Sequence, residues 1–375
     1  MIYEYDVKKY LIKEKKLKRG EKMLLLVINP GGTSTKLSIF ENEEEKIKKS
    51  IIHNYEDMKK FNRVMDQAEY RKNLILDFVK DEGFDINQFD AVVGRGGLMK
   101  AVPGGTYPVN EKMIADLKNM INGEHASNLG ALLSYEIGKE IDKPAFIVDP
   151  VSVDEFLDIS RITGIKEIEK SSWLHALNHK QVCRVTARKM GKRYDECNFI
   201  VAHLGSGNSV AAHKKGKMID GSGGRSDGPF SPERSGGLPT YALVKLCYSG
   251  KYTEDEMIDK ISNSGGMYSY LGTKDVKQIE KMAKEGNREY KLILEAFCYK
   301  VAKEISSYAA SLEGKIDRII VTGGIAYSEY LINYLEKKVG WIAAIEVIPG
   351  ELEMQGLASG AIRVLTGKEK PAEYK

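Results

Sequence analysis

The sequence has few cysteines, no long apolar segment and little net charge. Its four cysteines are scattered, with no C-x-x-C pair, which argues against a disulfide framework or a zinc site. No stretch has the length of apolar sequence that a membrane helix needs. A net charge of +4 spread over 375 residues, with no aromatic residues interleaved among basic runs, argues against nucleic acid as a partner. These absences favour a cytoplasmic enzyme that acts on small molecules.

The two commonest glycine-rich phosphate loops are also absent. The chain contains neither G-x-x-x-x-G-K-[ST] nor G-x-G-x-x-G as the opening of a helix. A Gly31–Gly32 turn does follow a hydrophobic strand, in "VINPGGTSTKLSIF" (27–40). After that turn, Thr35, Leu37 and Ile39 alternate with polar residues, which is typical of a second strand. A phosphate loop at this place would therefore be the turn of a β-hairpin.

The opening pattern occurs a second time. "NFIVAHLGSGNSVAAHKKGKMID" (198–220) repeats the order and spacing of "LLLVINPGGTSTKLSIFENEEEKIK" (24–48). Such an internal repeat predicts an α/β protein of two duplicated domains. Each would hold a mixed sheet flanked by helices, and a cleft between domains is a preferred small-molecule site. We expect an extension over 1–22, a first domain over 23–195 and a second over 196–375, with a final helix, from about residue 353, that packs back on the first domain.

The motifs resemble those of a known family. "INPGGTSTK", "VGRGG", "LHALNHK", "AHLGSGNSV" and "VTGGI" occur in the order found in the acetate and butyrate kinases. These belong to the superfamily of acetate kinases, sugar kinases, chaperone ATPases and actin, which implies two ribonuclease H-like (actin-like ATPase) domains. The segments "GRSDGPFSPERSGGLP", "ASNLGA" and "PAFIVDP" are similar to the butyrate branch. The resemblance covers the chain from about residue 23 to about residue 367.

The resemblance implies a set of site residues. Arg95 and Arg225 would bind the carboxylate substrate or the transferring phosphoryl group, and His175 would donate to that group in the transition state. Asp149 would serve catalysis and Mg²⁺, with Glu353 as a second metal ligand, although Glu351 stays an alternative in this register. Nucleotide binding is implied for Asn29, Gly31, Gly32, Thr33, Ser34, Lys36, His203, Gly205, Ser206, Gly207, Asn208, Asp275, Gly323, Gly324 and Ile325.

Several residues keep more than one interpretation. His175 and His179 share a helix face if their segment is helical, but the absence of an H-E-x-x-H glutamate and of a third ligand argues against zinc. We expect His179 to support its helix, and we leave the role of Arg234 open. Lys277 stands where the acetate members carry an arginine, and lysine offers no planar face to stack on a base.

The implied reaction is ATP-dependent phosphorylation of butyrate to butyryl phosphate, with ADP as the other product. A carboxylate is already nucleophilic at neutral pH, so catalysis depends on positioning and on cations that offset the repulsion between two anions. Isobutyrate, propionate and acetate are alternative acceptors, and an ATPase of the actin or chaperone type is the alternative outside this chemistry. The family also implies a homo-oligomer, a dimer or larger, formed through the second domain.

Overall fold

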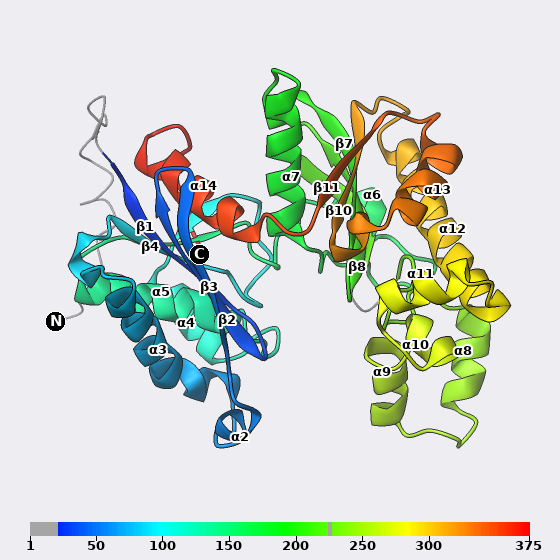
Figure 1. The fold of residues 1–375 in the computed structure, drawn as a ribbon, viewed down its shortest axis with the longest axis horizontal. Coiled ribbons are helices and arrows are strands. Elements are labelled where there is room, and N and C mark those ends of the chain that lie inside the picture. Colours follow the sequence, from blue (N-terminus) through cyan, green and yellow to red (C-terminus); the bar gives the residue numbers. More distant parts are fainter. Residues whose placement is uncertain (1–21, 224–226) are drawn as a thin grey trace. The chain divides into compact units, whose positions relative to one another are not determined.

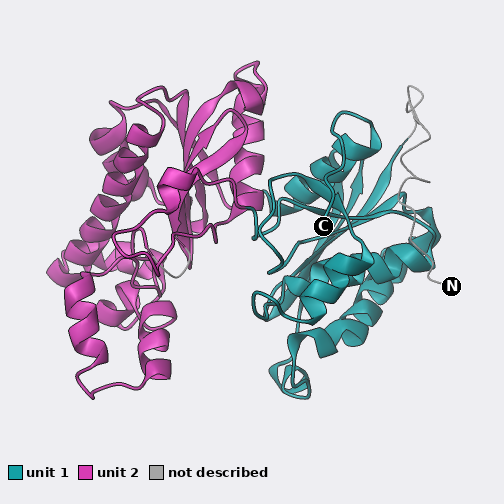
Figure 2. Ribbon diagram, turned by 180° about the vertical axis from the view of Figure 1, so that it is seen from behind, with its two compact units in different colours: residues 1–153, 352–375 teal, residues 154–351 magenta. Residues whose placement is uncertain are grey.

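The computed structural model describes residues 22–223 and 227–375. The predicted extension, except for its last residue, and the candidate Arg225 therefore lie outside the described residues. The chain divides into two compact units, which are coloured separately in Figure 2. Unit 1 comprises residues 1–153 and 352–375, and unit 2 comprises residues 154–351. Among the described helices, none is both long and apolar enough to cross a membrane.

Unit 1 contains a six-stranded mixed sheet in the order β3-β2-β1-β4-β6-β5. Strand β1 pairs antiparallel with β2 and parallel with β4, so the hairpin opens the sheet and its inner strand is central. Apolar residues fill β1 on both faces, as a strand covered on two sides requires. The strands are β1 (Leu24–Pro30), β2 (Ser34–Glu41), β3 (Glu44–Ile52), β4 (Ala91–Gly94), β5 (Thr106–Pro108) and β6 (Ala145–Val148).

Helices cover both faces of this sheet (Figure 1). Leu26 and Ile28 of β1 share a core with α3, α4 and α5, while the C-terminal helix α14 packs on β1, β4 and β6. The sequence pattern of residues 57–80 predicts one long helix, but this segment is divided, because a four-residue helix capped by Asn54 ends before a short 3-10 turn begins. The helical elements are α2 (Tyr55–Met58), η1 (Val64–Gln67), α3 (Ala68–Asp81), η2 (Ile86–Gln88), α4 (Glu111–Lys118), α5 (Asn128–Glu140) and α14 (Glu353–Leu365).

Unit 2 repeats the strand order. Its five strands run β11-β10-β7-β8-β9, with β7 antiparallel to β8 and parallel to β10. Read from the hairpin outward, β9-β8-β7-β10-β11 matches β3-β2-β1-β4-β6. The predicted fold class, two duplicated domains with mixed sheets flanked by helices, is therefore confirmed. The strands are β7 (Asn198–Leu204), β8 (Asn208–Lys214), β9 (Lys217–Gly223), β10 (Arg318–Gly323) and β11 (Ile345–Pro349).

The helices of unit 2 include a helical segment that lies apart from the sheet in Figure 1 and comprises α8 to α10. The long helix α12 packs on β7, β8 and β9, and α7 packs on β7 and β10. The helical elements are α6 (Asp158–Arg161), α7 (Ala176–Lys189), η3 (Tyr194–Glu196), α8 (Thr240–Cys247), α9 (Glu254–Ser262), α10 (Gly266–Leu271), α11 (Val276–Lys284), α12 (Arg288–Ser311), η4 (Gly324–Tyr327) and α13 (Glu329–Val339).

The unit boundaries differ from the domain boundary expected at residue 195. Helix α7 belongs to unit 2 rather than to the first domain, because its buried residues, including Val182 and Cys183, pack on the second sheet. Conversely, α14 belongs to unit 1, on which we expected the final helix to pack. The chain therefore passes between units after residue 153 and again after residue 351.

A glycine pair sets how closely α5 approaches β4. A Cβ on Gly94, the last residue of β4, would overlap the carbonyl of Gly130 in α5, and a Cβ on Gly130 would overlap the carbonyl of Arg95. Close packing of this kind leaves no room for even one methyl group. The pair thereby determines the position of Arg95.

We expect Gly94→Ala to lower the free energy of unfolding by about 3 kcal/mol, because the backbone must shift to admit the methyl group. Urea denaturation measures this change. Gly164→Ala is the control, since its added Cβ would meet no atom within 4 Å, and it should change stability by less than about 0.5 kcal/mol. Equal stabilities for the two variants would contradict the close packing.

Candidate functional site

In unit 1, an amide, a guanidinium and a carboxylate meet at one edge of the sheet. Asn29 lies near the end of β1, and Arg95 directly follows β4. These strands are parallel neighbours, so their carboxyl ends share one edge, which is where open α/β sheets bind ligands. The backbone N–H of Arg95 also donates to the carbonyl of Ile28 over 2.9 Å. The third member, Glu353, is the first residue of α14.

These three side chains form a closed set of hydrogen bonds. Arg95 Nη2 lies 3.0 Å from Glu353 Oε1, and Arg95 Nη1 donates to Glu353 Oε2 over 3.0 Å. Asn29 Nδ2 donates to the same Oε2 over 2.8 Å. Arg95 Nη1 also lies 3.3 Å from Asn29 Oδ1. The Glu353 side chain is 6% exposed and that of Arg95 24%, so the fork is held rigidly while part of it reaches solvent.

The two predicted metal ligands have different surroundings. Both oxygens of Glu353 already accept hydrogen bonds, and its partner Arg95 is a cation. Asp149 is fully buried, and its Oδ1 accepts from the backbone N–H of Gly105 over 2.8 Å. Its backbone has a φ of +39°, which is rare for a residue other than glycine and marks a constrained position.

The described residues contain no group of three or more His, Cys, Asp or Glu side chains arranged to hold a metal ion. Mg²⁺ bound mainly by phosphates and water needs only one or two protein carboxylates. Asp149 and Glu353 therefore stay candidates for such an ion.

The first glycine turn is supported from below by a buried arginine that the sequence analysis missed. Arg71 of α3 is 1% exposed. Its Nη1 donates to the carbonyl of Gly31 over 2.9 Å and to Thr35 Oγ1 over 3.0 Å, and its Nη2 lies 3.5 Å from the carbonyl of Gly32. Nε and Nη2 donate to Gln67 Oε1 over 3.0 and 2.7 Å. All five N–H groups are thus used on neutral acceptors.

Arg71 consequently places a positive charge beneath the turn with no carboxylate against it among residues 22–223 and 227–375. Burial lowers the pKa of Arg71 to about 10, so the guanidinium stays charged at neutral pH. The carbonyls of Gly31 and Gly32 are held toward this charge, while Gly32, Thr33 and Lys36 are exposed at the turn. The arrangement suits an anion on the outer side of the turn.

His53 completes this support and makes it sensitive to acid. Its Nε2 lies 2.8 Å from Thr35 Oγ1, and its side chain is buried. Burial, with the nearby charge of Arg71 as a smaller cause, lowers the pKa of His53 to about 4. An unfolded histidine has a pKa near 6.5. Between about pH 6.5 and pH 4 the unfolded state therefore binds a proton that the folded state does not, and stability falls as the pH falls.

We expect His53→Gln to remove this part of the acid sensitivity. On a change from pH 7 to pH 5, the variant should lose about 1–2 kcal/mol less unfolding free energy than the wild type. Urea denaturation at the two pH values measures the difference, with His125→Gln, an exposed histidine, as control. If the wild type and His53→Gln lose the same amount, His53 is not held neutral.

The second glycine turn, in unit 2, is held by side chains of its own. Asn208 Oδ1 accepts from the N–H of Gly205 over 3.2 Å, and Asn208 Nδ2 donates to the carbonyl of Phe230 over 2.8 Å. Ser231 Oγ donates to the carbonyl of Ser206 over 2.5 Å. Arg234, whose role was left open, lies over the turn, since a Cβ on Gly207 would be 2.6 Å from its Nη1.

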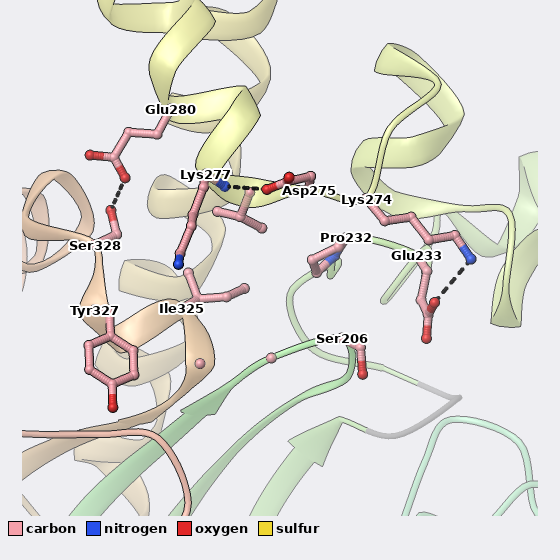
Figure 3. Close-up of a pocket in the computed structure, with 13 residues that line it drawn as sticks. Ser206, Pro232, Glu233, Lys274, Asp275, Lys277, Glu280, Ile325, Tyr327 and Ser328 are labelled. Atoms are coloured by element: carbon pink, nitrogen blue, oxygen red, sulfur yellow. Dashed lines mark hydrogen bonds and ion pairs between the residues drawn. The ribbon is translucent and has the colours of Figure 1, made fainter. Parts of the chain in front are cut away.

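A cavity of about 360 Å³ opens beside this turn. Figure 3 shows the residues around it. Five of the residues predicted to bind nucleotide line it together, although they come from three separate segments of the chain, and so does Lys277. These five are Gly205, Ser206, Asp275, Gly324 and Ile325.

Two of the residues predicted to bind nucleotide, Asp275 and Gly323, also have structural roles. Asp275 Oδ1 caps α11 by accepting from the N–H groups of Lys277 and Gln278. Gly323 has a φ of +92°, and a Cβ there would overlap the carbonyl of Leu204. Gly323 therefore lets β10 end against the turn that follows β7, which brings Gly324 to the cavity.

His175 and His203 of unit 2 form a stacked pair, and His203 lies near the end of β7. His175 immediately precedes α7, at its N-cap, rather than lying within the helix. Its ring stacks on that of His203, with centroids 4.0 Å apart and planes inclined by 10°. His203 Nε2 lies 4.0 Å from Glu351 Oε1. The alternatives Glu351 and Glu353 thus have different partners, and it is Glu353 that accompanies Arg95.

Solved structures with the same arrangement define the class of fold. The chain is similar to a crystal structure of Porphyromonas gingivalis acetate kinase, with 18% identity, a TM-score of 0.77, and coverage of 92% of this chain and 100% of that one. A propionate kinase from Francisella tularensis subsp. tularensis SCHU S4 matches with 19% identity, a TM-score of 0.70, and coverage of 90% and 98%. Acetate kinase from Entamoeba histolytica matches with 15% identity, a TM-score of 0.71, and coverage of 90% and 98%. The protein therefore has the fold of these kinases, two actin-like ATPase domains.

A family model also matches part of the sequence. Residues 169–338 match the model described as the acetokinase family. This segment contains every residue that lines the cavity of unit 2.

Proposed function

We propose that this protein is a short-chain carboxylate kinase that phosphorylates butyrate with ATP. The observation that carries the proposal is that the segment matched by the acetokinase family model holds the whole cavity beside the second glycine turn. The cavity has a size that suits a nucleoside, and Gly205 and Ser206 at its rim suit the phosphates that follow it.

The reaction needs no general base. One oxygen of the butyrate carboxylate forms a bond to the γ-phosphorus of ATP, the bond from that phosphorus to the β,γ-bridging oxygen breaks, and ADP leaves with the electron pair. No proton changes place. The barrier comes from the repulsion between two anions, so cationic and hydrogen-bonding groups that stabilise the charge in transit supply most of the rate.

The residues of each unit can be given roles on this basis. Arg95 would hold the acid or the phosphoryl group with the part of its fork that reaches solvent, because Asn29 and Glu353 keep the guanidinium in one orientation. The outer side of the Gly31–Gly32 turn would bind a phosphate above the Arg71 charge. His175 would donate a hydrogen bond to the phosphoryl group, with Arg225 as a further cation.

Magnesium would be held mainly by the ATP phosphates and water, with Asp149 and Glu353 as the protein carboxylates available to it. Its contribution would be to neutralise the β- and γ-phosphates. Every other contribution named here comes from side chains and backbone groups of the chain itself.

The test of the activity is ATP turnover in the presence of butyrate and hydroxylamine. A carboxylate kinase forms acyl hydroxamate in proportion to ADP, because the acyl phosphate is trapped. An ATPase of the actin or chaperone type would release phosphate from ATP with or without butyrate, and this result would refute the proposal.

The preference for butyrate rests on the sequence segments that are similar to the butyrate branch, "GRSDGPFSPERSGGLP", "ASNLGA" and "PAFIVDP". One methylene changes binding by only about 1–3 kcal/mol, so activity on neighbouring acids is expected. We expect kcat/KM to be highest for butyrate in a series that includes acetate, propionate and isobutyrate. A maximum at acetate or propionate would keep the reaction class and refute the preferred acid.

We expect Arg95→Ala to lower kcat by roughly 10³-fold, in the range found when a group that stabilises transferring charge is removed. The Kd for ATP should stay nearly constant, because the cavity of unit 2 does not contain Arg95. Arg193→Ala, which changes an exposed arginine, is the control and should keep wild-type turnover. Since the change also removes the cation beside Glu353, urea denaturation must show a folded variant, and normal turnover in such a variant would remove Arg95 from the mechanism.

A further inference from the structure

A continuous chain of hydrogen bonds runs through unit 2 and ends at His175. Tyr194 Oη lies 2.7 Å from His213 Nδ1, and His213 Nε2 lies 3.2 Å from His179 Nδ1. His179 Nε2 lies 2.8 Å from Ser209 Oγ, and Ser209 Oγ lies 2.8 Å from His175 Nδ1. Five side chains from η3, β8, α7 and the residue before α7 thus form one continuous sequence of contacts.

The inner members of this chain are buried and neutral. His179, Ser209 and His213 have no exposed surface. Burial holds the pKa values of His179 and His213 well below the usual value. The neighbouring charges act in the same direction, since Lys180 and Arg184 face His213. A neutral imidazole donates from one nitrogen and accepts at the other.

There are two directions in which each member of the chain donates to the next. In the first, Tyr194 donates to His213 Nδ1, His213 Nε2 donates to His179 Nδ1, His179 Nε2 donates to Ser209, and Ser209 donates to His175 Nδ1. Neutral His175 must then carry its proton on Nε2. In the second direction every bond is reversed, and the proton of His175 is on Nδ1, turned toward Ser209.

The phenol at the far end favours the first direction. A phenol hydroxyl is a stronger donor than an imidazole N–H and a weaker acceptor than an imidazole nitrogen, so Tyr194 Oη donates to His213 Nδ1, and neutral His213 then donates from Nε2 to His179 Nδ1. Because His179 Nδ1 faces His213, the nitrogen next to Ser209 is Nε2. The proton of His179 is therefore on Nε2, which sets the direction of the whole chain.

The tautomer of His203, whose ring stacks on that of His175, is set by a separate group of hydrogen bonds. Thr322 Oγ1 donates to the carbonyl of Gly350 over 3.0 Å, so it accepts from Asn178 Nδ2 at 3.3 Å. The same amide nitrogen lies 2.9 Å from His203 Nδ1, which must accept. His203 thus carries its proton on Nε2, as His175 does in the first direction.

We propose that Tyr194, His213, His179 and Ser209 form a directed hydrogen-bonded chain that holds the proton of His175 on Nε2, which makes Ser209 a positioning residue for phosphoryl transfer. The part on catalysis rests on the proposed function, because it assumes that His175 donates to the phosphoryl group. The part on the tautomer of His175 does not rest on the proposed function. A histidine in the wrong tautomer can keep its place and still lose most of its catalytic effect.

The tautomers can be measured without any activity. In protein labelled with ¹⁵N-histidine, two-bond ¹⁵N–¹H correlation spectra distinguish the Nε2–H form from the Nδ1–H form, and His175→Gln identifies the signals of His175. We expect Nε2–H for His175, His179 and His213 in the wild type. An Nδ1–H form of His175 in the wild type would overturn the proposal, whatever the kinetics show.

The catalytic part is tested with Ser209→Ala, which breaks the chain next to His175. We expect the His175 signals to shift from the Nε2–H form to a mixture of both, kcat to fall at least about tenfold, and the Kd for ATP to stay within about twofold. Ser134→Ala is the matched control, because Ser134 is equally buried and donates to the carbonyl of Ala131 in unit 1. It should leave the spectrum and kcat unchanged.

Two further outcomes separate the two proposals. If Ser209→Ala fails to fold, Tyr194→Phe breaks the far end of the chain, and an unchanged tautomer preference at His213 in that variant would overturn the chain. If the wild type has the expected tautomers but no carboxylate-dependent turnover, the chain is supported and the proposed function is refuted.

Discussion

In both hairpin turns of this protein a side chain donates to a backbone carbonyl oxygen within the glycine turn, which satisfies that oxygen inside the fold and helps to fix the turn. In unit 1 the buried guanidinium of Arg71 donates to the carbonyl groups of Gly31 and Gly32, and it adds a positive charge beneath the turn. In unit 2 the hydroxyl of Ser231 donates to the carbonyl of Ser206. The donor to the carbonyl groups of the turn is thus a charged side chain in unit 1 and a neutral side chain in unit 2.

The two units therefore share one arrangement of strands but carry different polar side chains at the sheet edge. Both sheets begin with a hairpin whose inner strand pairs with a parallel neighbour, so each has a glycine turn at the edge where open α/β sheets commonly bind ligands. Unit 1 places a fixed guanidinium, Arg95, at that edge, and unit 2 places a cavity and the stacked rings of His175 and His203 there. Such a difference suits a reaction in which one set of residues binds a nucleotide and another set binds an anionic acceptor.

Much of this could be predicted from sequence because it depends on local pattern. The repeated strand-turn-strand motif predicted both hairpins, and the glycines beside Arg95 and before Ile325 marked strand ends that the structure places at sheet edges. The predicted helix over 57–80 was divided, because the Asn54 cap starts a short helix that the periodicity did not reveal. The domain boundary at residue 195 differed for a related reason: which sheet covers the buried face of α7 depends on packing between distant segments.

The residues that sequence reasoning missed are those whose meaning depends on long-range contacts. Arg71 lies in an amphipathic helix where an arginine is usually solvated, and only the position of the hairpin above it shows that it is buried. His213 and Tyr194 carry no motif, and they matter only because β8 and η3 bring them to His179. Glu353 was chosen over Glu351 from the family pattern, while its bond to Arg95 depends on where α14 begins.

The central claim of the proposed function is that each glycine turn binds phosphate groups of ATP through its backbone N–H groups. Amide hydrogen exchange with and without ATP measures this directly, in peptides that cover residues 31–34 and residues 205–208. The account predicts that ATP slows exchange in both peptides, and that adenosine, which lacks phosphates, slows exchange in neither to the same degree. Protection of only one turn by ATP, or equal protection by adenosine, would contradict it.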